Sequence, residues 1–240
     1  MRLDRYLTLC DLGTRKQVKE LIARGHVSVN EQISCNPGAA VDGPVLVDGK
    51  EPEYRPFVLI LMNKPAGLLT ATEDRKQKTV MDLLPERDRR RNPSPVGRLD
   101  KDTTGLLLIT DDGQAAHALI SPKSHVEKQY LATLDGPVGS AETEAFARGL
   151  ELSDFTSLPA RLIPCEGDQA RVVLHEGKYH QVKRMFAAVG KNVLRLHRER
   201  IGSLTIPESL AEGEWMYLDL RIWNELREEA GLPPVGKEIE

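Results

Sequence analysis

Cysteine and long apolar runs are both scarce in this sequence of 240 residues. The three cysteines, Cys10, Cys35 and Cys165, are odd in number and include no Cys-x-x-Cys pair, which argues against a disulfide framework and a zinc site. No apolar run approaches the length of a membrane span, and Met1–Arg5 lacks the apolar core of a signal peptide. We therefore expect a soluble, cytoplasmic protein with no membrane partner.

Motifs for several common chemistries are missing as well. There is no Gly-x-Gly-x-x-Gly or Walker loop for a nucleotide cofactor, no serine in a nucleophile elbow, and no zinc-deaminase signature. His175 and His180 lie five residues apart across a predicted turn, which is not a metal-ligand spacing. We expect neither a cofactor nor a metal ion.

The sequence also lacks an excess of positive charge, because its formal net charge is −3. The charges are nevertheless unevenly distributed. Residues 75–101 contain nine Lys or Arg and four Asp or Glu, residues 176–204 contain seven and two, and residues 205–240 contain three and nine. We expect the two basic blocks to line a face that meets a polyanion and the acidic segment to stay in solvent. The alternative is that folding scatters these charges over the surface.

Residues 2–49 have the pattern of a small unit of helices and strands. Apolar residues recur at helical spacing over residues 3–10 and over residues 14–25, where Thr14 suits the N-cap and Gly25 the C-terminal cap. Alternating or short apolar runs predict strands at residues 26–30, 32–35 and 45–47.

The second predicted helix of this unit is strongly basic. Helix, turn, basic helix and hairpin together resemble the S4 RNA-binding domain, although Glu31 replaces the family's usual glycine. The matching segments are Arg2-Leu3-Asp4, Arg15, Leu21-Ile22, Gly25-x-Val27-x-Val29-Asn30 and Val47-Asp48-Gly49. The resemblance implies RNA binding by Arg2, Arg5, Arg15, Lys16 and Lys19, with Arg24 nearby. The alternative is an amphipathic helical hairpin with solvated basic side chains.

Prolines and charges at residues 50–56 mark a linker. We therefore expect domains at residues 1–49 and 57–232 and a polar C-terminal tail at residues 233–240. The larger domain shows no repeated βα units, which predicts an α+β fold on a mixed, mainly antiparallel sheet with flanking helices. Strands are predicted at residues 57–62, 106–109, 127–134, 170–175 and 193–197. Helices are predicted at residues 80–84, 114–119, 141–149 and 179–190, and the basic stretch 87–91 is expected to be a mobile surface loop.

The segment Gly97–Gly105 is the most informative part of the chain. It places Arg98, Asp100 and Asp102 in a glycine-hinged turn before a fully apolar run. A carboxylate held against a buried strand end needs a cation and hydrogen bonds, because burying a bare charge is costly. Taken alone, the segment is either a structural ion-pair corner or a catalytic site.

Three further motifs add to this segment. The segment Gly97–Gly105 with the apolar run after it resembles the signature of pseudouridine synthases. All four motifs together resemble the RsuA branch, the small-subunit ribosomal RNA pseudouridine synthases. The likeness covers nearly the whole chain, up to the acidic C-terminal segment. The motifs are Asn63-Lys64-Pro65-x-Gly67, Glu127-Lys128-x-Tyr130 and Gly177-x-Tyr179-His180-Gln181-Val182-Lys183-Arg184-Met185-Phe186.

This resemblance implies an activity and a partner. The reaction isomerises one uridine of small-subunit (16S) ribosomal RNA, uridine 516 in the family, to pseudouridine. It breaks the bond from nitrogen to ribose, turns the base and rejoins it through carbon, with no redox change and no cofactor. The partner is ribosomal RNA of the small subunit in an assembling ribonucleoprotein, and we expect the protein to act as a monomer.

The resemblance also implies catalytic roles. Asp100 corresponds to the family's aspartate, which either attacks the sugar or helps to detach the base, and both routes remain open. An ionised Asp100 needs a neighbouring cation, for which Lys183 occupies the family's position and Arg184 is the alternative. Tyr130 would stack on the flipped uracil and take part in proton transfer.

Other residues of the segment and its surroundings have supporting roles. Arg98 would enter the RNA helix where the uridine leaves its stack, and Lys64 would face the RNA. Asp102 is expected to be a hydrogen-bonding partner of the turn, and His180 to pack or hydrogen-bond without acting as a base.

Two other functions fit parts of the pattern. A non-catalytic RNA-binding assembly factor would not need Asp100, Tyr130 and a basic partner together. A synthase of the large-subunit (23S) branches would tend towards Asn-Thr-Ser and Asn-Arg-Gln-Ile-Arg, where this chain has Asp102-Thr103-Thr104 and Tyr179-His180-Gln181-Val182-Lys183.

Overall fold

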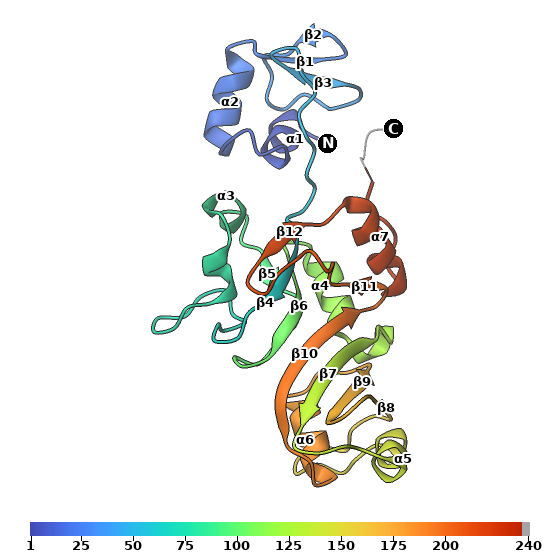
Figure 1. The fold of residues 1–240 in the computed structure, drawn as a ribbon. Helices are drawn as coiled ribbons and strands as arrows, with labels where there is room; N and C mark the ends of the chain where they lie inside the picture. Colours follow the sequence, from blue (N-terminus) through green and yellow to red (C-terminus); the bar gives the residue numbers. More distant parts are fainter. Residues whose placement is uncertain (237–240) are drawn as a thin grey trace. The chain divides into compact units, whose positions relative to one another are not determined.

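The computed structural model describes residues 1–236, which fall into two compact units (Figure 1). One unit is Met1–Val58 with the C-terminal residues from Val235, and the other is Leu59–Pro234. Of the polar tail predicted at residues 233–240, the last four residues lie outside the described part of the chain.

The N-terminal unit contains two helices and a small antiparallel sheet. Helix α2 (Arg15–Ala23) begins with a capping box, in which the Thr14 hydroxyl accepts a hydrogen bond from the Gln17 amide and the Gln17 side chain accepts one from the Thr14 amide. The other elements are α1 (Leu3–Leu9), β1 (Val27–Val29), β2 (Gln32–Ile33) and β3 (Val45–Val47), with strand order β2-β1-β3. The helices and strands predicted for this unit are confirmed.

The larger unit is built on one mixed sheet, in which only β6 and β10 pair in parallel among the described strands. The main strands run in the order β12-β4-β6-β10-β7-β9-β8, with β5 on β6 and β11 on β10. Their bounds are β4 (Leu59–Lys64), β5 (Ser94–Pro95), β6 (Thr104–Thr110), β7 (Lys128–Leu134), β8 (Arg161–Pro164), β9 (Gln169–Leu174), β10 (Val193–Ile201), β11 (Leu204–Thr205) and β12 (Trp215–Tyr217). The predicted α+β fold on a mainly antiparallel sheet is confirmed.

A glycine allows the parallel pairing at the centre of this sheet. Gly105 on β6 has a φ of +106°, and a Cβ there would lie 2.3 Å from the carbonyl oxygen of Arg198 on β10. Only glycine combines this backbone conformation with so close an approach. Gly105 therefore lets the strand that follows the Asp100 turn lie directly beside β10.

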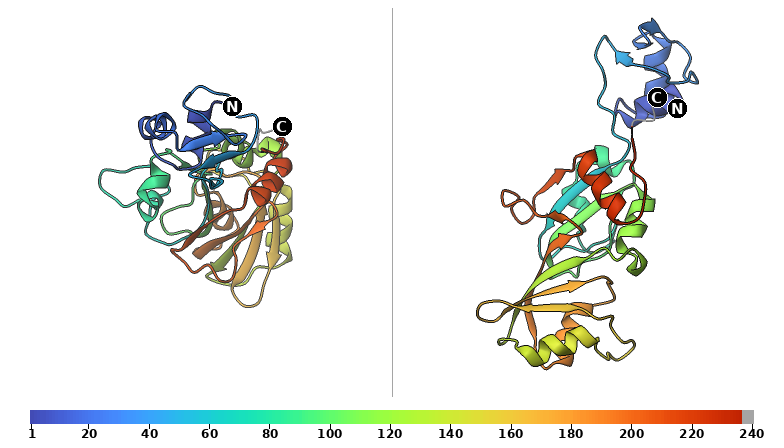
Figure 2. Two further views of the ribbon diagram at one scale, coloured as in Figure 1. Left: turned by 90° about the horizontal axis from the view of Figure 1, so that it is seen from above. Right: turned by 90° about the vertical axis from the view of Figure 1, so that its right-hand side faces the viewer.

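Helices and 3₁₀ turns flank the sheet, and none in the described residues has the length and apolar character to cross a bilayer. Figure 2 shows α4 in green beside α7 in red, and α5 in yellow at the end of the sheet where β8 lies. Their bounds are η1 (Val80–Leu83), α3 (Glu86–Arg89), α4 (Gly113–Ile120), η2 (Pro122–Ser124), α5 (Ser140–Arg148), α6 (Gln181–Ala188) and α7 (Leu220–Glu229).

The expectation that residues 87–91 form a mobile loop is wrong. The segment overlaps α3, in which Asp88 is buried and accepts a hydrogen bond from the Tyr217 hydroxyl at 2.7 Å. Arg91 pairs with Asp111 at 2.8 Å. The basic side chains are therefore partly used to fix this segment to the rest of the unit.

In the described part of the acidic C-terminal segment the Asp and Glu residues are exposed as expected, but the expectation is wrong for other residues of the segment, which are buried. Trp223 on α7 is 1% exposed and donates from Nε1 to the Asp112 carboxylate at 3.0 Å. Arg227, also buried, forms an ion pair with the same carboxylate. Acidic residues occupy the outer face of α7, while its apolar face packs inward, an amphipathic arrangement that a net-charge count hides.

Candidate active site

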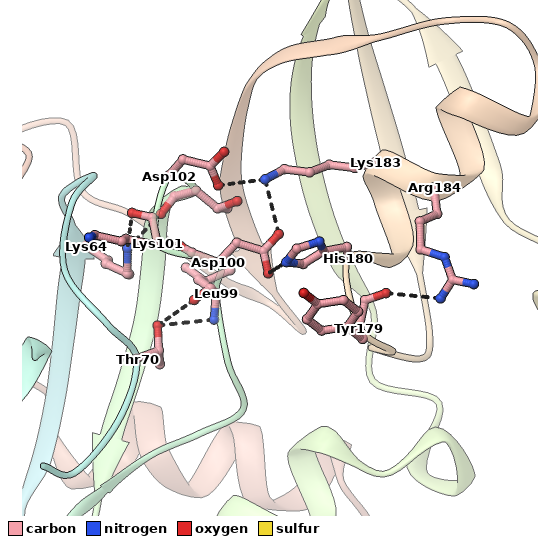
Figure 3. Close-up of polar contacts among 11 residues, drawn as sticks. Lys64, Thr70, Leu99, Asp100, Lys101, Asp102, Tyr179, His180, Lys183 and Arg184 are labelled. Atoms are coloured by element: carbon pink, nitrogen blue, oxygen red, sulfur yellow. Dashed lines mark hydrogen bonds and ion pairs between the residues drawn. The ribbon is translucent and has the colours of Figure 1, made fainter. Parts of the chain in front are cut away.

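The Asp100 turn is held by a buried lysine. Lys64, at the end of β4, is 0% exposed, and its Nζ donates to the carbonyl oxygens of Pro65, Asp100, Lys101 and Thr103 at 2.9–3.4 Å. Figure 3 shows Lys64 beside Asp100 and Lys101 of this turn. Burial lowers the pKa of Lys64 to about 8, against the opposing charges of Asp102 and Asp100. The prediction that Lys64 faces RNA is wrong, because it has no exposed surface and instead fixes the shape of the turn.

Lys183 is the cation that the structure brings to Asp100. Its Nζ lies 3.2 Å from Asp100 Oδ2 and 2.6 Å from Asp102 Oδ1. Burial by itself would lower the pKa of Lys183, but the hydrogen bond to Asp102 and the charge of Asp100 outweigh it and the pKa is raised. The hydrogen bond from Lys183 in turn lowers the pKa of Asp102. One ammonium group thus bridges both carboxylates, and Asp102 is paired across to α6.

Arg184, the alternative cation, points away from Asp100 (Figure 3). Its guanidinium forms an ion pair with Asp154 and donates to Ser153 Oγ at 2.9 Å. It also lies 4.9 Å above the ring of Phe155. Successive residues of a helix face different directions, so α6 presents Lys183 and Arg184 to different surroundings.

The backbone before α6 brings a histidine and a tyrosine to the same site. The predicted helix at residues 179–190 begins only at Gln181, because His180 has a left-handed φ of +49°. His180 Nε2 lies 3.5 Å from Asp100 Oδ1. The Tyr179 ring stacks on His180 with centroids 3.8 Å apart and is 72% exposed. No role was predicted for Tyr179, although its place in the motif beside His180 and Lys183 was a usable signal.

Asp100, Tyr130 and Lys183 line one cleft. Tyr130 comes from β7 and is 8% exposed, while the exposed side chain of Arg98 also lines the cleft. The turn before β6, strand β7 and the start of α6 therefore converge on one cleft.

The basic residues of the N-terminal unit gather in a second hollow. Arg2, Arg5, Arg15 and Lys19 line it together with Asp4, and all four basic side chains are exposed. Arg2 is engaged by the Asp4 carboxylate through two hydrogen bonds of 3.0 and 2.9 Å. The fifth residue predicted to bind RNA, Lys16, is exposed but does not line this hollow. Residues 1–236 contain no group of three or more His, Cys, Asp or Glu side chains placed to hold a metal ion.

Comparison with known proteins places this arrangement in a family. The family model described as RNA pseudouridylate synthase matches residues 58–188, which include Asp100, Tyr130 and Lys183. This chain belongs to the RNA pseudouridylate synthase family. A solved structure described as a pseudouridylate synthase has a TM-score of 0.67 and 34% identity, with 94% of this chain and 99% of that one covered.

Curated relatives of this pseudouridine synthase extend over almost its full length. An uncharacterised RNA pseudouridine synthase of Bacillus subtilis is 39% identical, with 94% of this chain and 99% of the relative covered. The ribosomal small subunit pseudouridine synthase A of Vibrio cholerae is 43% identical, with 91% and 96% covered, and that of Escherichia coli K12 is 41% identical, with 90% and 95% covered. The resemblance found from the motifs is thereby confirmed.

Proposed function

We propose that this enzyme converts one uridine of small-subunit ribosomal RNA, the position equivalent to uridine 516, to pseudouridine, with Asp100 as the reacting carboxylate. The observation that carries the proposal is the ion pair between Asp100 and Lys183 inside a cleft that Tyr130 also lines. The full-length similarity to two ribosomal small subunit pseudouridine synthases supports the substrate class.

The geometry suits a carboxylate that acts on a sugar or a base. The Asp100 side chain is 26% exposed, so a ligand can reach the carboxylate, while Lys183 contacts its Oδ2 and His180 its Oδ1. Lys183 balances the negative charge of the free carboxylate. As the base leaves or the sugar is attacked, charge on Asp100 changes, and a fixed ammonium stabilises the charged form at no cost of reorganisation. Attack on the sugar and detachment of the base are both compatible with this arrangement.

Tyr130 and Arg98 complete the proposed chemistry. The uracil ring, once out of the RNA helix, would lie in the cleft against Tyr130, whose hydroxyl can take part in proton transfer. Arg98, exposed beside the cleft, would enter the space that the uridine leaves. Extrusion of a base costs a few kcal/mol, and contacts of basic side chains with phosphates would offset it.

The N-terminal unit would supply sequence-independent affinity for RNA. Its two helices and small sheet fit the S4 domain resemblance, and Arg2, Arg5, Arg15 and Lys19 line one hollow of its surface. Such a cluster binds phosphates through charge and releases counterions. We propose that this unit helps to hold the ribosomal RNA on which the larger unit acts.

Carbodiimide mapping of pseudouridine in ribosomal RNA tests the proposed function. Cells that lack this protein are expected to lose one small-subunit pseudouridine, and the wild-type gene to restore it. Asp100→Asn keeps the shape of the side chain but removes its charge, so it is expected not to restore the site.

Asp102→Asn is the matched control, because it lies in the same turn and contacts the same lysine but does not line the cleft. It is expected to restore the modification. Restoration by Asp100→Asn would contradict the catalytic role of Asp100, and loss of a large-subunit site would place the enzyme in the other branch.

A further inference from the structure

A second pocket, also lined by Tyr130, adjoins the Asp100 cleft. The two share Arg98, Tyr130, Glu176 and Gly177 as lining residues, so they adjoin each other along these side chains. The 43% exposed Ile120 and the exposed Arg98 form the rim, where the pocket meets solvent.

Two buried cations line this pocket, and neither forms an ion pair within residues 1–236, although the Arg198 guanidinium lies 5.9 Å from the centre of the Tyr130 ring. Lys128 on β7 is 6% exposed and Arg198 on the adjacent β10 is 4% exposed. Lys128 Nζ and Arg198 Nη2 have no hydrogen-bond partner within residues 1–236. Arg198 is held in place by its other nitrogens, since Nε donates to the Leu106 carbonyl at 2.7 Å and Nη1 lies 3.5 Å from the Tyr130 hydroxyl. Side chains alternate between the two faces of a strand, so Lys128 and Tyr130, two residues apart on β7, lie on the same face.

Unpaired buried charges are costly, and such side chains are normally paired or bound to a ligand. The Glu176 carboxylate also lines the pocket, but its Oε1 is already engaged, because it accepts from the Leu158 amide and from Gln181 Nε2. With Arg98, three cationic side chains face one carboxylate, and the pocket as a whole is positive. A neutral uracil carbonyl would leave this excess charge in place, whereas a phosphodiester, with one negative charge and two free oxygens, reduces it.

We propose that the Lys128–Arg198 pocket is a phosphate subsite that takes one backbone phosphate next to the flipped uridine of the substrate RNA. The proposal rests on the function proposed above, because it is the RNA that brings the phosphate. Tyr130 and Arg98 line both spaces, so the nucleotide's base in the cleft and a neighbouring phosphate in the pocket would lie next to each other. Extraction of the uridine is then coupled to neutralisation of two buried charges that form no ion pair within residues 1–236.

Phosphate-ethylation interference tests this subsite on the full chain. A small-subunit ribosomal RNA transcript, ethylated at random phosphates, is partitioned by binding to the wild-type protein and to Lys128→Met, a neutral side chain of similar length. Wild type is expected to reject RNA ethylated at one phosphate adjacent to the converted uridine, and Lys128→Met to accept it. In a plot of the logarithm of the binding constant against the logarithm of the salt concentration, the magnitude of the slope is expected to be smaller by about one for Lys128→Met than for wild type.

A thermal melt without RNA distinguishes the two roles of Lys128, because replacing a lysine that stabilises the fold would lower the Tm. Lys128→Met is expected to raise the Tm by about 2–4 °C, because it removes an unpaired buried charge. Lys191→Met is the matched control, because Lys191 follows the C-terminal end of α6 and does not line the pocket. It should change neither the interference pattern nor the Tm.

The outcomes separate the two proposals. If the wild-type protein converts a uridine of the transcript and Lys128→Met keeps the full interference pattern, the phosphate subsite is wrong and the proposed function stands. If Lys128→Met lowers conversion while the interference at every phosphate is unchanged, the pocket holds the base and the subsite is again wrong. If no uridine is converted by the wild-type protein, the proposed function has failed, and the subsite fails with it.

Discussion

Two buried lysines, Lys64 and Lys128, show how hydrogen-bond acceptors decide whether a buried lysine stabilises the fold. Lys64 and Lys128 are both almost fully buried, and burial lowers the pKa of each to about 8. Lys64 donates to four backbone carbonyls, whereas Nζ of Lys128 finds no acceptor in the described chain. Chemically identical groups at similar depth are therefore expected to contribute to stability with opposite sign.

Lys64→Met is expected to lower the free energy of unfolding of the larger unit by about 2–3 kcal/mol, because buried carbonyls lose their donor. Urea unfolding measures the loss. Lys101→Met, in the same turn but exposed and bonded to Gln77 through its side chain, is the control and should change stability by less than about 0.5 kcal/mol. A stability of Lys64→Met equal to wild type would show that the turn keeps its shape without this lysine.

The lowered pKa of Lys128 predicts a pH dependence of stability. Between pH 8 and 10.5 the folded protein has released a proton that the unfolded chain still binds, so the free energy of unfolding rises with pH. The contribution of Lys128 is about 1 kcal/mol between roughly pH 7 and pH 9. Urea unfolding at both values should give a smaller rise for Lys128→Met than for wild type. An equal rise in the two proteins would mean that Lys128 titrates normally.

At the scale of elements, the pairing of β6 with β10 positions the site. β6 follows the Asp100 turn, and β10 follows α6, which carries Lys183. The parallel register sets Gly105 opposite Arg198, so one strand pair connects the cleft with the Lys128–Arg198 pocket. The close approach at Gly105 is what allows this register.

Gly105→Ala is expected to destabilise the larger unit by about 3 kcal/mol or more, because its Cβ would overlap backbone atoms of Arg198 and its φ is strained. Gly113→Ala is the matched control, since Gly113 begins α4 with no heavy atom within 4 Å of the added Cβ. It should be neutral or slightly stabilising. Urea unfolding of both variants compares them, and similar values would disprove the steric role of Gly105.

Most elements were predictable because their patterns are local. Local sequence patterns predict these elements directly. Examples are the apolar runs of β4 and β6, the alternation of β7 and the N-cap residue Thr14 of α2. Helix α7 was missed because acidic residues dominate its composition and its partner, Asp112, lies more than 100 residues away.

The candidate site residues were proposed from motifs, but their partners in the structure could not be predicted in this way. Whether Lys183 or Arg184 meets Asp100 depends on the left-handed turn at His180 and on the rotation of α6, which follow from tertiary packing. The burial of Lys64 has the same origin, because a lysine at a strand end is ordinarily solvated.

At the scale of the whole molecule, the basic hollow of the N-terminal unit predicts how RNA affinity depends on salt. Replacing Arg5, Arg15 and Lys19 together by glutamine should weaken RNA binding and reduce the magnitude of the salt slope by about 2–3, since each phosphate that is no longer neutralised lowers it by about one. Filter binding across a salt series measures the slope. Lys50→Gln, exposed in the same unit but outside the hollow, is the control. An unchanged slope in the triple variant would show that the hollow does not meet phosphates.

The burial of Trp223 against Asp112 has a practical consequence for such measurements. The only two tryptophans of the chain, Trp215 and Trp223, both belong to the larger unit, and the N-terminal unit has none. Intrinsic emission excited at the red edge of protein absorption therefore reports on the catalytic unit alone, even in the intact chain. The stacked pair Tyr6 and Tyr54 lies within the N-terminal unit. Unlabelled protein thus carries a spectroscopic reporter that follows the unfolding of its larger unit without a contribution from the N-terminal unit.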